Sequence, residues 1–277
     1  MTAESNNGNN TKPQFHYNSL TALFLNCSLK PTGRLSHTEK LMEVSAAIMS
    51  KQGVKTEIIR VADYQIPPGV YPDMTEHGFD RDDWAPPRQG GWDANLPAEV
   101  YPDIEKLGFP RRPDQALSEK VWDANILVVG TPIWLGEESS VCRLLIERLY
   151  AESGKLNDNG QSRFYGKVGG CIVTGNEDGV KHCSMSVLYA LQHLGYLIPP
   201  QADAGWIGEA GPGPSYADEE SNGPDNDFTQ RNVTIMSWNL MHLAKMLQDN
   251  NGIQSFGNNR KQWEEGERFG HPGRRLV

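Results

Sequence analysis

The sequence lacks the features that mark several large classes of protein. It has no apolar run of about 18 residues, so we expect no membrane-spanning helix. Residues 1–18 are polar and rich in asparagine, without the apolar centre of a secretory signal, which favours a disordered tail and a cytoplasmic location. The net charge is −9, from 35 acidic and 26 basic residues, so neither nucleic acid nor an anionic membrane is expected as a partner.

Motifs that would anchor other enzyme classes are also missing. The four cysteines are scattered, with no Cys-x-x-Cys pair, which indicates free thiols and no metal site. No Gly-x-Gly-x-x-Gly follows the first apolar segment, and Gly-x-x-x-x-Gly-Lys-Ser/Thr is absent, so neither a dinucleotide-type site nor nucleoside triphosphate hydrolysis is supported. Gly-x-Ser-x-Gly and His-Glu-x-x-His are absent as well, which leaves hydrolases and metalloproteases without an anchor.

What the sequence does contain is an alternation of short apolar segments with amphipathic ones. The apolar segments predict five strands, at Leu20–Leu25, Val54–Val61, Ile126–Val129, Val168–Val173 and Tyr196–Ile198. The alternation predicts an α/β fold with a doubly wound five-stranded parallel sheet of order 2-1-3-4-5, in one domain of residues 19–248. Such sheets bind ligands beyond the carboxyl ends of their strands.

Some segments exceed a minimal fold of this type. Residues 62–118 are an expected insertion between the second and third strands, in which Val70-Tyr71-Pro72-Asp73 returns as Val100-Tyr101-Pro102-Asp103. Two copies are too few for a solenoid, and the second leads into the third strand, so we expect the first copy, Val70–Asp93, to be dispensable for the sheet. Residues 202–228 carry seven acidic residues and no basic one and predict a lid loop, and residues 249–277 predict a polar C-terminal tail.

Three predicted loops leave the carboxyl ends of the first, third and fourth strands and therefore converge. The first loop runs from Asn26 to Thr38 and leads into a predicted helix, with Ser36 at the spacing of a capping box. Hydroxyl and free backbone N–H groups at a helix N-terminus bind phosphate, and basic residues add positive charge. The predicted phosphate ligands are Ser28, Lys30, Ser36, His37 and Thr38.

The second and third loops suit a planar ring. In the second, Pro132 is expected to end the strand and Trp134 to offer a flat apolar face, while Glu137 and Glu138 would repel a phosphate. The third has two glycines that allow close approach and an asparagine that can donate and accept at the edge of a heterocycle. The predicted ring contacts are Pro132, Ile133, Trp134, Leu135, Gly136, Thr174, Gly175, Asn176 and Gly179.

A phosphate cradle, an aromatic ledge and a polar turn together suit flavin mononucleotide (FMN). The same residues resemble a known family, the flavodoxin-like NAD(P)H-dependent oxidoreductases, which includes flavin reductases and quinone reductases. The similarity is loose in Cys27–Thr38 and close in Thr131–Ser139, where the family has Ser/Thr-Pro-x-Tyr/Trp-x-Gly-x-x-Ser. The resemblance implies a flavodoxin-like fold and FMN as cofactor, with Pro132–Gly136 along the isoalloxazine ring.

The resemblance further implies an FMN-dependent oxidoreductase that passes electrons from NAD(P)H, as co-substrate, to a quinone or other small acceptor. The cofactor carries that chemistry, so no catalytic side chain is predicted. An electron carrier that docks a protein partner is the alternative, suggested by the acidic balance, and a flavin-binding protein without turnover is a third reading. A homodimer or homotetramer, and a substrate wall formed by Trp206 and Tyr216, also stay open.

Overall fold

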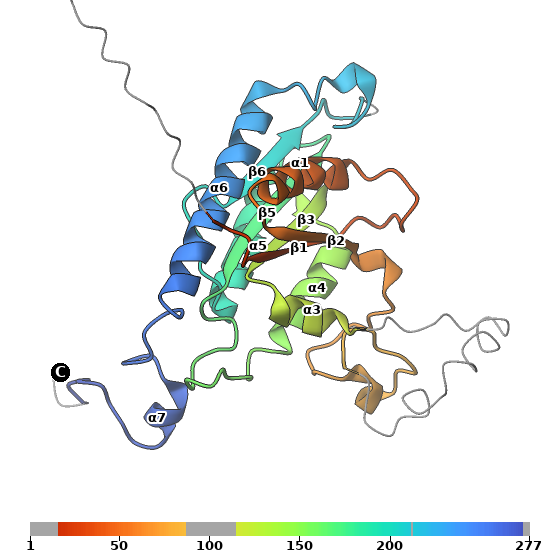
Figure 1. Cartoon of the computed structure of the whole chain (residues 1–277). Helices are drawn as coiled ribbons and strands as arrows, with labels where there is room; N and C mark the ends of the chain where they lie inside the picture. The colour runs from red at the N-terminus through yellow and green to blue at the C-terminus, as the bar shows by residue number, and fades with distance from the viewer. Residues whose placement is uncertain (1–15, 87–114, 212, 274–277) are drawn as a thin grey trace, which may run out of the picture.

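The computed structural model describes residues 16–86, 115–211 and 213–273 (Figure 1). Its sheet has parallel strands in the order β2-β1-β3-β5-β6. They are β1 (Thr21–Asn26), β2 (Lys55–Arg60), β3 (Ile126–Trp134), β5 (Val168–Gly175) and β6 (Asp203–Ile207). Counted along the chain, these strands follow 2-1-3-4-5, which confirms the flavodoxin-like arrangement. A further two-residue strand, β4 (Glu137–Glu138), was not predicted and pairs antiparallel with the end of β3.

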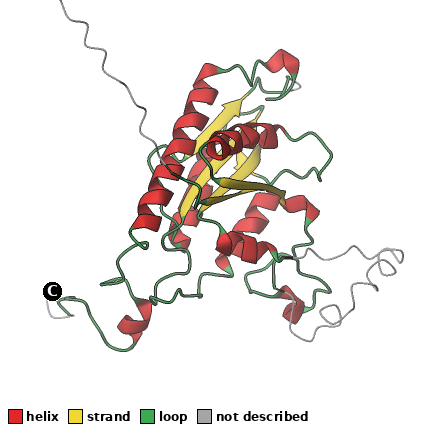
Figure 2. Ribbon diagram, in the orientation of Figure 1, coloured by secondary structure: helices red, strands yellow, loops and turns green. Residues whose placement is uncertain are grey.

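Helices cover both faces of the sheet (Figure 2). One face is covered by α1 (His37–Lys51) and α6 (Asp227–Asp249), and the other by α3 (Leu117–Asp123), α4 (Ser140–Tyr150) and α5 (Val180–Leu194). Phe24 of β1 belongs to the first of these two cores and its neighbours Leu23 and Leu25 to the second, as the alternation of side chains along a strand requires. The strands are therefore buried on both faces, which is why they appear in the sequence as continuous apolar runs.

The fifth parallel strand was placed wrongly. It is Asp203–Ile207, whereas the predicted segment Tyr196–Ile198 contributes only a single bridge between Leu197 and Val168. Pro199 and Pro200 follow at once, and prolines cannot continue a ladder. The first part of the predicted lid loop 202–228 is thus a strand at the edge of the sheet, and it escaped prediction because only Ala204 and Trp206 of it are buried.

The sequence predicted that Pro132 ends the third strand, but β3 continues through it to Trp134. The pairing of β3 with β1 stops at Gly130, but its pairing with β5 continues to Pro132 and Thr174. Beyond Gly130 the β1 side of the strand is therefore an edge, where a missing N–H is tolerated. The chain then turns through Leu135 (φ 53°) and Gly136 (φ 76°) into β4, and positive φ at both central residues is typical of a tight type I′ hairpin.

The described part of the insertion packs into the domain. Trp84 is fully buried in the core beneath α4, and its Nε1 donates to Glu152 Oε1 at 3.2 Å. Asp82 is paired with Arg148 of α4, and both side chains are fully buried. These residues belong to the first copy of the repeat and pack against the core, so the structure gives a physical reason to expect that deleting this copy destabilises the domain. Residues 87–114, which hold most of the second copy, lie outside the described residues.

The two predicted tails are described only in part. Residues 1–15 lie outside the described residues, and Tyr17, which was assigned to the N-terminal tail, is buried with its hydroxyl 2.8 Å from Nδ1 of His242. The predicted C-terminal tail contains a short helix, α7 (Arg260–Glu264), and is fastened by Gln161, whose Nε2 donates to the carbonyl of Ile253 at 3.1 Å. Within the described ranges, no helix is both long and apolar enough to cross a bilayer.

Candidate flavin site

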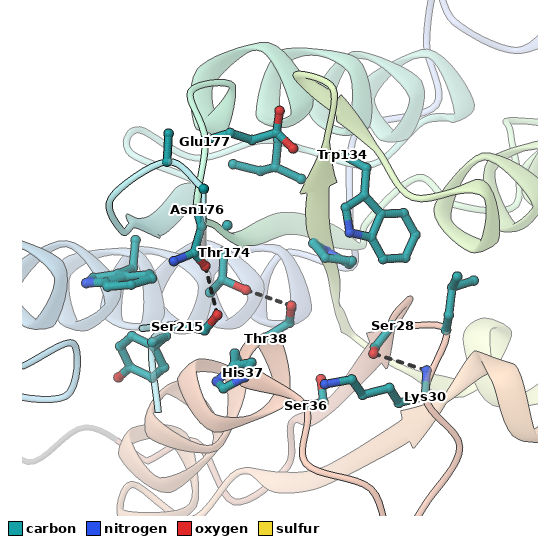
Figure 3. Close-up of a pocket in the computed structure, with 18 residues that line it drawn as sticks. Ser28, Lys30, Ser36, His37, Thr38, Trp134, Thr174, Asn176, Glu177 and Ser215 are labelled. Carbon is teal, nitrogen blue, oxygen red and sulfur yellow. Dashed lines mark hydrogen bonds between the residues drawn. The ribbon is translucent and has the colours of Figure 1, made fainter. Parts of the chain in front are cut away.

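A pocket of about 760 Å³ opens at the carboxyl ends of the parallel strands (Figure 3). It brings together most of the predicted phosphate and ring ligands, although they come from three loops far apart in the sequence. The predicted residues that line it are Ser28, Lys30, Ser36, His37, Thr38, Pro132, Ile133, Trp134, Thr174, Gly175 and Asn176.

The phosphate-type loop has the geometry of an anion site. Ser36 is the N-cap of α1, and its Oγ accepts from the backbone N of Glu39 at 3.3 Å. His37 and Thr38, in the first turn, both line the pocket, and their N–H groups have no acceptor within the helix. Ser28 and Lys30 approach from the loop side, where the backbone N of Lys30 donates to Ser28 Oγ at 3.3 Å. Hydroxyls, helix amides and one ammonium group therefore fit a phosphate monoester.

A buried polar network holds this loop in place. The Nδ2 of Asn26 donates to Ser36 Oγ at 3.1 Å and to Glu39 Oε2 at 2.8 Å, and Glu39 is paired with Arg60 at the end of β2. Arg60 also donates to the carbonyl of Pro31 at 2.6 Å. The hydrogen bond from Arg60, more than any other contact, lowers the pKa of Glu39. The carboxylate thus stays ionised and joins the loop, the helix start and β2.

The middle of the pocket joins α1 to β5. Thr38 and Thr174 are both buried, and their hydroxyl oxygens are 2.8 Å apart. His37 lies beside them, and its Nδ1 accepts from the backbone N of Ala217 at 3.2 Å. Burial lowers the pKa of His37; the negative charge of Asp218 acts against this shift, and the positive charge of Lys30 adds to it. The neutral ring is therefore favoured, and because Nδ1 accepts a hydrogen bond, its proton is on Nε2.

The hairpin that carries Trp134 is fixed at both ends. Thr131 Oγ1 accepts from the backbone N of Ser139 at 3.0 Å, and Ser139 Oγ donates to the carbonyl of Cys27 at 2.6 Å. At the turn, the backbone N of Leu135 donates to Glu177 Oε1 at 2.9 Å. The first and last residues of the Thr131–Ser139 motif are therefore structural, while Trp134, 43% exposed, stands at the pocket wall.

Three predicted ring contacts lie elsewhere. Leu135, Gly136 and Gly179 line a second hollow, of about 540 Å³, together with His182. The tight turn at positive φ sends Leu135 away from the pocket and leaves it 93% exposed. Gly179 is required by packing, because a Cβ there would lie 2.8 Å from the carbonyl oxygen of Gly136.

The rest of the pocket wall was left open or not predicted from the sequence. Trp206 and Tyr216, left open as a substrate wall, both line the pocket, and their rings pack edge to face with centroids 5.8 Å apart. The pocket residues without a prediction are Leu29, Glu177, Ala210, Gly211 and Ser215. Three of them, Ala210, Gly211 and Ser215, come from the loop after β6, which the sequence predicted as a lid loop without indicating which of its residues reach the pocket. In the described ranges, no group of three or more His, Cys, Asp or Glu side chains is placed to hold a metal ion.

Comparison with known proteins agrees with this geometry. The family model described as NADPH-dependent FMN reductase matches residues 20–206. The chain belongs to this family.

Two curated relatives and one solved structure refine the comparison. The chain is 34% identical to the 8-demethyl-8-aminoriboflavin-5'-phosphate synthase of Streptomyces davaonensis, over 83% of the chain and 79% of that protein. The crystal structure of RosB with bound 8-demethyl-8-formylriboflavin-5'-phosphate superposes with a TM-score of 0.66 at 30% identity, covering 93% of this chain and 95% of that one.

The second curated relative is much longer. The chain is 51% identical over 247 residues to the divalent metal cation transporter MntH of Mycobacterium bovis, covering 89% of the chain but 31% of that protein. Because the chain spans about a third of the relative's length, the family membership rests on the flavin reductase model and on the synthase.

Proposed function

We propose that this chain binds FMN in the pocket and uses it to pass electrons from NAD(P)H to a quinone or other small acceptor. The proposal rests on one observation: polar groups suited to a phosphate and aromatic side chains suited to a planar ring line different parts of the same pocket. Ser28, Ser36 and the first amides of α1 form a phosphate cradle at one end, and aromatic side chains wall the rest. Bound FMN would supply hydride and electron transfer, while the chain holds the phosphate, places the ring and limits solvent.

The residues have separate parts in this proposal. Lys30 supplies the positive charge for the phosphate, and the Asn26–Glu39–Arg60 network keeps the cradle in shape. Trp134 and Trp206 line the pocket from β3 and β6, so a planar ring bound there would meet aromatic side chains. His37, whose Nδ1 accepts from the backbone N of Ala217, would have its Nε2–H free to donate to the phosphate or the ribityl chain of bound FMN.

A second candidate function follows from the comparisons. The relative from Streptomyces davaonensis is a synthase of an aminated riboflavin phosphate, and RosB holds a formylated one as an intermediate. The flavin would then be a substrate of this chain and not a cofactor. The two functions differ in the fate of the flavin, which returns unchanged in the first and changes mass in the second.

The direct test is anaerobic mixing of the FMN-loaded protein with NADH or NADPH. Rapid bleaching of the flavin absorbance, reversed by a quinone, is expected for the reductase, and mass spectrometry should recover unmodified FMN. An electron carrier would bleach only after a reductase is added. Protein that neither carries nor takes up FMN would contradict both functions.

The cradle gives a mutational prediction. Ser28→Ala and Thr38→Ala should each weaken FMN binding by about ten- to a hundredfold, because a hydrogen bond to a charged group is worth about 1.5–3 kcal/mol. Riboflavin, which lacks the phosphate, should lose little. Ser50→Ala, at the far end of α1, is the matched control. Equal losses for FMN and riboflavin, measured by fluorescence titration, would place the phosphate elsewhere.

A further inference from the structure

The loop after β6 returns across the pocket in a segment that we call the strap, Gly213–Ala217. Its residues Ser215 and Tyr216 line the pocket, and Ser215 lies across the pocket from Trp134 (Figure 3). Tyr216 is anchored in the core, since it is 1% exposed and its hydroxyl accepts from Gln230 Nε2 of α6 at 3.1 Å. Within the same loop, the backbone N of Ser215 donates to Asp218 Oδ2 at 2.7 Å, and the carbonyl of Tyr216 accepts from Ser221 Oγ at 2.9 Å. The first strap residues, Gly213 and Pro214, are held by a side chain from another loop.

Asn176, at the end of β5, makes most of these contacts. Its Nδ2 donates to the carbonyls of Pro214 at 2.8 Å and Gly213 at 3.2 Å, and its Oδ1 accepts from Ser215 Oγ at 2.8 Å. The side chain that the sequence suggested as a reader of the flavin edge therefore uses its donors and its acceptor on the strap. Gly208 makes room for it, because a Cβ there would lie 2.7 Å from Asn176 Nδ2.

The other end of the strap is held from the cradle side. The backbone N of Ala217 donates to His37 Nδ1 at 3.2 Å, and His37 directly follows the cradle residue Ser36 at the start of α1. The strap thus runs from the loop after β5 to the start of α1. The strap therefore connects the wall at the end of β5, where the flavin ring is predicted, to the wall at the start of α1, where the phosphate is predicted.

We propose that Asn176 is a positioning residue that latches the strap across the pocket and thereby slows the release of the bound flavin. Three hydrogen bonds to consecutive strap residues keep the segment closed, and a ligand beneath it leaves only after they break. The ligand named here rests on the proposed function, whereas the latch itself is a property of the free chain.

The latch can be tested without ligand. Hydrogen–deuterium exchange in the strap, Gly213–Ala217, should be several-fold faster in Asn176→Asp and in the milder Ser215→Ala than in the unaltered protein, while α1 exchanges at the same rate. Asn239→Ala is the matched control, because its Nδ2 donates to the carbonyl of Pro200 at 2.8 Å on a loop that does not line the pocket. Unchanged exchange in both variants would overturn the proposal.

Release of FMN gives the second test. Asn176→Ala should speed dissociation by about tenfold, equivalent to about 1.4 kcal/mol, and Ser215→Ala by about threefold. If both act through one latch, Ser215→Ala should add almost nothing in the Asn176→Ala background. Additive effects would mean that Asn176 contacts the flavin directly and would overturn the latch. An unaltered protein that binds no FMN would refute the proposed function alone, because the exchange experiment still decides the latch.

Discussion

Two tryptophans show how the same residue type serves different ends. Trp84 is fully buried and hydrogen-bonded to Glu152, whereas Trp134 is 43% exposed at the pocket wall and follows a proline within β3. A buried indole contributes to the free energy of unfolding, and a half-exposed one at a concave site is available to a ligand. Local sequence gives no sign of this difference for Trp84, which lies in an irregular segment.

At the residue scale we therefore predict opposite results for the two truncations. Trp134→Ala should weaken FMN binding by about three- to tenfold, the value of an aromatic contact of about 0.5–1.5 kcal/mol, with little change in melting temperature. Trp84→Ala should cost about 3–5 kcal/mol of stability. Thermal unfolding of the apoprotein together with FMN titration separates them. A large melting loss with normal affinity in Trp134→Ala would make that residue structural.

At the element scale, the start of α1 depends on a charge that titrates. The hydrogen bond from Arg60 lowers the pKa of Glu39 in the folded protein below its usual value of 4.5, so the folded state binds this proton more weakly than the unfolded chain. The corresponding contribution to stability is complete above about pH 4.5 and is lost as the pH falls through the lower folded pKa. Protonation would also loosen the cradle, because Asn26 and Arg60 both bond to this carboxylate.

We predict that Glu39→Gln lowers the stability at pH 7 and flattens its dependence on pH between about 5 and 3. Urea unfolding at several pH values measures both effects. Glu43→Gln is the matched control, since Glu43 lies on the same helix in an exposed pair with Lys40 and such pairs contribute little. An acid dependence as steep in Glu39→Gln as in the unaltered protein would contradict the assignment.

At the scale of the whole molecule, the insertion and α4 are joined by a buried ion pair. Burial is the largest influence on both groups: it raises the pKa of Asp82 and lowers that of Arg148. The attraction between the two charges therefore compensates only in part for the hydration that each has lost. Arg148 also donates to the carbonyl of Tyr71 at 2.8 Å, and Asp82 accepts from the backbone N of Met74 at 2.9 Å. The pair thus determines the path of the chain between η2 (Met74–His77) and Trp84.

Asp82→Asn should therefore destabilise the protein by about 3–5 kcal/mol, because it leaves a buried guanidinium without its counter-charge. Asp80→Asn, a change of the same kind at an exposed neighbour, should be almost neutral. The midpoint of urea unfolding is the measurement. A small effect at Asp82 would restore the sequence-based view that the first repeat is an addition to the domain and not a part of it.

The sequence by itself determined the alternation of strands and helices, the strand order and the loops that carry the cradle. Continuous apolar strands, the Ser36 cap and the Thr131–Ser139 motif are local patterns, and each can be read within about ten residues. The same patterns led to FMN, since the phosphate cradle, the aromatic residue after Pro132 and the polar turn after Val173 are each visible in a short stretch of sequence.

Only the tertiary structure decided the edge strand, the path of β3 past Pro132, and the partners of Asn176 and Asp82. Asp203–Ile207 is a strand because β5 offers it a ladder, and Pro132 is tolerated because β1 has ended beside it. Asn176 bonds to residues 37 to 39 positions away, and Arg148 to Asp82 across 66 positions. A polar side chain presents the same donors and acceptors to any partner, so the sequence shows what it can bond with, and the fold alone selects which group stands in reach.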